Sequence, residues 1–134
     1  MRSARFVFLL IAILIYPIQA AIGTSKRKIP CKIPANAISC YWTHGRLIAG
    51  NGTPSFRLWK VGTHRVLGIY SGPSVDRYNS LDNEDPALPT NLDKYNFPED
   101  TVFADFEVCP LEPEKTRHML AACIESAKNI VVKK

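Results

Sequence analysis

The feature that most constrains this sequence is the stretch between residues 40 and 70. Two runs rich in β-forming residues, 41–48 and 56–61, flank the dipeptide Asn51-Gly52. Asn-Gly is a strong signal for a β-hairpin, because both residue types tolerate a positive φ angle. A glycine-containing turn then leads into a third run of this kind, at 65–70. The stretch therefore predicts a three-stranded antiparallel meander.

Two further strands are predicted in the C-terminal third. The run 101–109 alternates apolar with other residues, which is typical of a strand with one buried face. Its predicted core face holds Val102, Ala104, Phe106 and Val108, and its outer face holds Phe103, Asp105 and Glu107. The run 119–132 fits a helical stripe as well as a strand. We favour a strand, because the run ends in β-branched residues.

Apolar residues occur on both faces of the predicted meander, so part of the sheet is expected to be covered twice. This indicates a mainly β fold: a small antiparallel β-sandwich or barrel with one long irregular loop at 71–100. We expect a single domain at 39–134. A basic tail and a disulfide-tied segment leading into the sheet, together 21–38, would precede it.

All the cysteines lie after the first 30 residues, at Cys31, Cys40, Cys109 and Cys123. An even number in an oxidising compartment is typical of two disulfides. Three pairings are possible, and we favour Cys31–Cys40 with Cys109–Cys123, because both close short local loops. A zinc site is the alternative, but the C-x-x-C spacing is missing. We expect no metal and no other cofactor.

The N-terminus has the pattern of a secretory signal peptide at 1–20. Arg2 and Arg5 precede an unbroken apolar run at 6–16, which is too short for a membrane span of about 20 residues. An uncleaved anchor is the alternative. We expect cleavage after Ala20, a secreted or periplasmic protein, and no transmembrane segment in the mature chain. The formal net charge then falls from +5 to +3, and we expect no nucleic-acid partner.

The long connection 71–100 is rich in proline, polar residues and acids, and has no periodicity. A connection of this length in a small domain is either functional or a cover for a strand edge. Its acids lack the D-x-[DN]-x-[DN]-G order of a calcium loop. As a partner-binding loop it would use Tyr78, Asp82, Glu84, Asp85, Tyr95 and Phe97. An acidic, aromatic loop suits a basic or sugar-bearing partner.

Other candidate functional residues are few. Trp42 and Trp59 fit the core, and they also fit a stacking surface for sugar rings. The histidines, His44, His64 and His118, are scattered and form no metal-ligand pair. Side-by-side acids on one strand do not suit glycoside hydrolysis, which needs two carboxylates across a cleft. The sequence therefore predicts no enzyme and no catalytic residue.

Several motifs together resemble a group of small, exported, largely uncharacterised bacterial proteins. They are H-G-R-L (44–47), N-G-T-P (51–54), R-L-W-K-V-G-T (57–63), R-V-L-G (65–68), F-A-D-F-E-V-C-P (103–110) and C-I-E-S-A-K-N-I-V-V (123–132). More loosely, G-R-L followed by N-G-x-P and R-x-W is similar to the opening hairpin of transthyretin-like β-sandwiches. That resemblance implies two packed sheets and a binding role. The Y-R-G-S ending of the branch that hydrolyses a hydroxyisourate is missing here.

These observations predict an exported, non-catalytic binding or interaction module for a protein or carbohydrate partner. Two alternatives stay open. One is a structural, envelope-associated protein without a small ligand, and the other is a small hydrolase.

Overall fold

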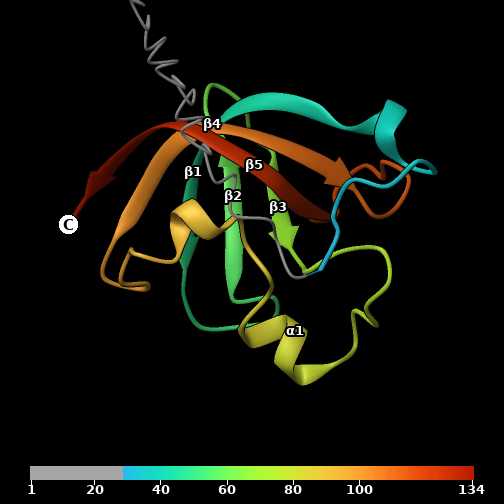
Figure 1. Ribbon diagram of the computed structural model, residues 1–134, viewed down its shortest axis with the longest axis horizontal. Coiled ribbons are helices and arrows are strands. Elements are labelled where there is room, and N and C mark those ends of the chain that lie inside the picture. The colour runs from blue at the N-terminus through green and yellow to red at the C-terminus, as the bar shows by residue number, and fades with distance from the viewer. Residues whose placement is uncertain (1–28) are drawn as a thin grey trace, which may run out of the picture.

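The computed structural model describes residues 29–134 (Figure 1). The predicted signal peptide at 1–20 and the basic tail at 21–28 lie outside the described residues. The strands are β1 (Tyr41–Ala49), β2 (Phe56–Lys60), β3 (Val66–Ile69), β4 (Thr101–Pro110) and β5 (Leu120–Lys133). One short helix, α1 (Ser80–Glu84), and two 3-10 turns, η1 (Ala37–Ser39) and η2 (Thr90–Leu92), complete the elements.

The five strands form a closed barrel in the order β1-β2-β3-β5-β4. The predicted meander is confirmed, since β1 pairs with β2 and β2 with β3, both antiparallel. The prediction of a small, mainly β domain with a sandwich or barrel is confirmed as a barrel, in which one pair, β3 with β5, is parallel and not antiparallel. Strand directions alternate along the chain, and a ring with an odd number of strands must contain one parallel pair. β4 returns by a long connection to pair with β1, which gives the Greek-key order 4-1-2-3 among the first four strands.

The barrel interior is filled by the face of β4 that the sequence predicted. Val102, Ala104, Phe106 and Val108 all have no exposed surface. The interior is completed by fully buried side chains from the other strands and from the long connection: Leu47, Leu58, Ile69, Leu92 and Ile124. β5 is a strand, as favoured, and pairs with β4 along most of its length. The hydrophobic core therefore lies inside the barrel.

The predicted hairpin is confirmed, and its connection has close to the length that the predicted strands left for it. The hairpin is closed over residues 50–55, where the Gly50 amide donates to the Ser55 carbonyl at 3.0 Å. Only Gly52 in this connection has a positive φ, of 103°. The connection is long enough for Ser55 to contact the long connection.

The predicted disulfide pairing is wrong. Cys31 is bonded to Cys123 and Cys40 to Cys109. Cys109 and Cys123 do occupy neighbouring strands in direct register, but they are not bonded to each other. The reason is the leading segment, residues 29–40, which lies across the ends of β4 and β5. Each of its two cysteines therefore meets a cysteine from a different strand.

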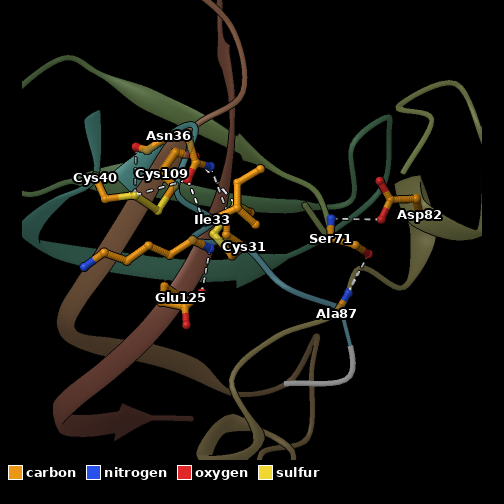
Figure 2. The surroundings of a disulfide bond; sticks show 11 residues. Cys31, Ile33, Asn36, Cys40, Ser71, Asp82, Ala87, Cys109 and Glu125 are labelled. Atoms are coloured by element: carbon orange, nitrogen blue, oxygen red, sulfur yellow. Dashed lines mark hydrogen bonds between the residues drawn. A yellow bond between two sulfur atoms is a disulfide. The ribbon is translucent and has the colours of Figure 1, made fainter. Parts of the chain in front are cut away.

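Hydrogen bonds hold the leading segment in this position (Figure 2). The Asn36 side chain donates to the Cys31 carbonyl at 2.9 Å and accepts from the Ile33 amide at 2.8 Å. The Lys32 amide donates to Glu125 of β5 at 2.8 Å, and the Lys32 ammonium group donates to Glu107 of β4 at 2.6 Å. The segment is thus tied to both strands by polar contacts as well as by disulfides.

Candidate functional site

A cavity of about 760 Å³ opens where β1 ends and β2 begins. Its walls come from two parts of the chain that are distant in sequence. One is the β1–β2 connection with Ala49 and Phe56 at its ends, and the other is the second half of the long connection, residues 84–98. A cavity of this size is in the range used for small ligands.

The two walls are joined by hydrogen bonds at Ser55. The Ser55 amide and hydroxyl both donate to the Asn83 carbonyl at 2.9 Å. The hydroxyl also reaches the Glu84 carbonyl at 2.9 Å. These bonds use carbonyl groups at the C-terminal end of α1, which would otherwise lack partners. They hold α1 against the β1–β2 connection and so shape one rim of the cavity.

A second set of bonds folds the start of the long connection back on itself. The Ser71 amide donates to a carboxylate oxygen of Asp82, and the Ala87 amide donates to the Ser71 hydroxyl, both at 2.8 Å (Figure 2). Asp82 is only 4% exposed. Its side chain therefore positions the connection and, unlike the other predicted loop acids, is not presented at the surface. A role of Asp82 in partner binding stays a prediction.

An aromatic wall connects the cavity to the core. The Phe97 ring meets Phe56 edge-on, with centroids 5.0 Å apart, and Tyr95 packs against the same core. Leu92 is 1% exposed, and Asn91 donates to the Ala127 carbonyl of β5 at 2.8 Å. Residues 91–97 are therefore part of the folded domain, and the long connection is not a detached loop.

The mouth of the cavity is acidic. Glu84, Asp85 and Asp93 line it and are exposed. None of the three carboxylates forms an ion pair with a described residue. The described lining contains no lysine, arginine or histidine side chain. The carboxylates thus give this part of the surface a negative potential, which Lys94, placed over the ring of Tyr95, offsets only in part.

The cavity brings together Glu84, Asp85, Tyr95 and Phe97 of the predicted partner-binding loop. It leaves out Tyr78, which is 91% exposed at the outer end of the connection. Sequence reasoning missed Asp93 and the contribution of the β1–β2 connection. Asp93 could have been included because it lies between predicted loop residues. Nothing in the sequence indicated that the β1–β2 connection would face this loop.

The core interpretation of the two tryptophans is wrong for Trp42, which is 46% exposed on the outer face of β1. Lys128 of β5 lies 4.2 Å from the centre of its ring. Trp59 is half-buried, donates from its indole nitrogen to the Thr63 carbonyl at 2.7 Å, and pairs with Arg46. Trp42 lies four residues from Arg46, or about 13 Å along the strand. The two indoles are therefore not adjacent on the outer face, and the stacking surface stays a prediction.

The predicted outward direction of Asp105 and Glu107 agrees with the strand pattern, but both carboxylates are bonded. Asp105 accepts from Asn129 at 2.8 Å and lies 2.9 Å from the His44 ring. The hydrogen bond from Asn129, followed by that with His44, lowers the pKa of Asp105 below its ordinary value. Glu107 pairs with Lys32. His64 and His118 are exposed, and no described hydrogen bond or ion pair joins either of them to Asp105 or Glu107.

No protein family, curated protein or solved structure matches this chain. The resemblances to exported bacterial proteins and to transthyretin-like domains therefore stay predictions. In the described part of the chain, no helix is both long enough and apolar enough to cross a membrane.

Proposed function

We propose that this protein is a non-catalytic binding module that takes a cationic group into its acidic cavity. The group would be an ammonium or guanidinium on a short apolar arm, presented by a protein or by an amino sugar. The observation that carries the proposal is the set of exposed carboxylates, Glu84, Asp85 and Asp93, above an aromatic wall. The carboxylates would attract the cation, and burial of its apolar arm against the aromatic rings would add to the binding free energy.

Binding is favoured over catalysis by the chemistry of the lining. A serine or threonine hydroxyl needs an adjacent base to become a nucleophile. The described lining offers hydroxyl groups but neither histidine nor lysine, so its carboxylates are the groups that could serve as that base. Exposed carboxylates without a buried partner suit recognition of charge better than proton transfer. The barrel by itself assigns no ligand, since one fold serves many functions.

Neutralising the three carboxylates together is expected to weaken cation binding about tenfold, since one exposed ion pair contributes about 0.2–1 kcal/mol. The variant is Glu84→Gln with Asp85→Asn and Asp93→Asn. Binding is measured by NMR titration with two probes, a blocked Ala-Ala-Lys-Ala-Ala peptide and a glucosamine oligomer. The probe that binds more tightly distinguishes a protein partner from a carbohydrate partner.

Three controls accompany this titration. Glu99→Gln makes the same kind of change in the same connection, outside the cavity lining, and should leave affinity unchanged. A norleucine peptide replaces the lysine probe without charge and should bind far more weakly. The basic residues 26–28 directly precede Ile29, which lines the cavity, so a variant with glutamine at 26–28 tests competition from the chain itself. Equal binding of the lysine and norleucine peptides would contradict the proposal.

The proposal includes a location outside the cytosol, reached through a cleaved signal peptide at 1–20. It is supported by the two disulfides, because disulfides persist in oxidising compartments such as the periplasm and the extracellular space. Protein recovered from the expressing cells is expected to begin at Ala21, as measured by intact mass and N-terminal sequencing. Recovery of a chain that still begins at Met1 would contradict it.

A further inference from the structure

A second cavity, of about 180 Å³, lies at the opposite end of β1 from the acidic cavity. Tyr41, the first residue of β1, lines it, whereas the last residue of β1, Ala49, lines the acidic cavity. Its other walls are the region where β2 leads into β3 and the β4–β5 connection, residues 111–119. The two cavities share no lining residue and differ in chemistry.

The basic side chains in the lining of this second cavity are Lys60, Arg65 and His118. The Lys60 ammonium donates to the Tyr41 hydroxyl at 3.3 Å and lies 4.7 Å from the centre of that ring. It forms no ion pair with any described carboxylate. Lys60 is thus held in place while its charge stays uncompensated. Among the described residues, none forms a hydrogen bond or an ion pair with His118.

Both acids in the lining already have partners: each accepts a hydrogen bond or forms an ion pair. Glu112 accepts from the Ala121 amide at 3.0 Å and from Arg77 at 2.8 Å, one bond to each carboxylate oxygen. The Ala121 bond, followed by the Arg77 bond, lowers the pKa of Glu112, so this carboxylate stays ionised and satisfied. Glu114 forms an ion pair with Arg65. Neither carboxylate is paired with Lys60.

When Arg77, which pairs with Glu112 from outside the lining, is counted, the local charge balance is positive. Arg65 is offset by Glu114, and Glu112 by Arg77, which leaves Lys60 without a counterion. Lys115 and Arg117, exposed in the same connection, add to the positive potential. We propose that this cavity is a second binding site, which takes a compact oxyanion of the phosphate or sulfate type. Lys60 would bind the anion directly, with His118 and the remaining donors of Arg65 beside it.

Sulfate is the first probe, because its charge stays constant near neutral pH. In a buffer of low ionic strength, NMR titration is expected to give saturable shifts at residues 60–66 and 112–118. Lys60→Gln should weaken binding about tenfold, as expected for loss of a charge-assisted hydrogen bond. Lys94→Gln is the matched control, because Lys94 also lies over a tyrosine ring, 5.2 Å from Tyr95, but outside this cavity. The affinity of the Lys94→Gln variant for sulfate should stay within about twofold of that of the unmodified chain.

Glu114→Gln provides a test of opposite sign. Removing this carboxylate releases Arg65 and adds one positive charge, so sulfate should bind about threefold tighter or more. A variant that is merely damaged cannot show tighter binding. Inorganic phosphate is expected to behave like sulfate. The proposal is overturned if sulfate gives no saturable shifts at this cavity, if Lys60→Gln binds like the unmodified chain, or if Glu114→Gln binds no more tightly.

Discussion

Replacing Cys31 and Cys123 together by alanine is expected to lower the free energy of unfolding by about 3–4 kcal/mol in the chain-entropy description of disulfides. Because the Cys40–Cys109 bond remains, the loop that Cys31–Cys123 closes runs only through residues 31–40 and 109–123. Cys40→Ala with Cys109→Ala should cost about as much, since the remaining bond shortens its loop through the same two segments. Denaturant unfolding of each double variant measures the loss.

Counting the free thiols in the same variants distinguishes the observed disulfide pairing from the local one. With the bonds found here, removing Cys31 and Cys123 leaves Cys40 and Cys109 bonded to each other, so thiol titration of the denatured variant should detect no free thiol. If the local pairing were correct, both remaining cysteines would have lost their partners and two thiols would react. Detection of two free thiols would therefore contradict the structure, whatever the stability of the variant.

Phe106→Ala is expected to cost about 3–5 kcal/mol of unfolding free energy, the usual penalty for removing a large side chain from a packed interior. The Phe106 ring has no exposed surface. It lies beside Gly45, where an added Cβ atom would stand 3.2 Å from the ring. The space left by the ring is therefore enclosed by backbone that cannot move in to fill it.

Phe103→Ala on the same strand is the matched control for this substitution. Phe103 lies on the outer face of β4, half-buried, with Lys133 placed 5.1 Å from its ring centre. Its removal creates no interior cavity, so a loss of about 1 kcal/mol is expected. Equal losses for the two variants, measured by denaturant unfolding, would show that the face assignment of β4 is incorrect.

Most of the barrel could be predicted from the sequence because its signals are local. The alternation at 102–108 follows from the two-residue period of a strand, which places successive side chains on opposite faces. The meander follows from β-forming runs separated by glycine-containing turns. In β5 the β-branched residues at 130–132 resolved an ambiguous run in favour of a strand, because their side chains fit a pleated surface well.

The candidate site was only partly predictable. The sequence singled out the long connection by its length and acidity, and Glu84, Asp85, Tyr95 and Phe97 do meet at one cavity. The cavity itself also needs Ser55 and its neighbours, which are about 30 residues away in the chain. Asp82 lies in the same acidic run as Glu84 and Asp85, but its side chain turns inward and accepts from the Ser71 amide. Which of these three acids is buried depends on backbone amide donors from elsewhere in the chain. No local sequence pattern reveals where those donors lie.

Local residue patterns predicted the strands, the buried face of β4 and the presence of a functional or covering connection, because each depends on residues a few positions apart. The cysteine pairing, the closure of the barrel and the walls of each cavity became evident from the three-dimensional fold alone. Cys109 and Cys123 stand in register on neighbouring strands, yet each is bonded to the leading segment that crosses them. Such pairings depend on how distant segments meet in space, and that arrangement is set by packing of the whole barrel.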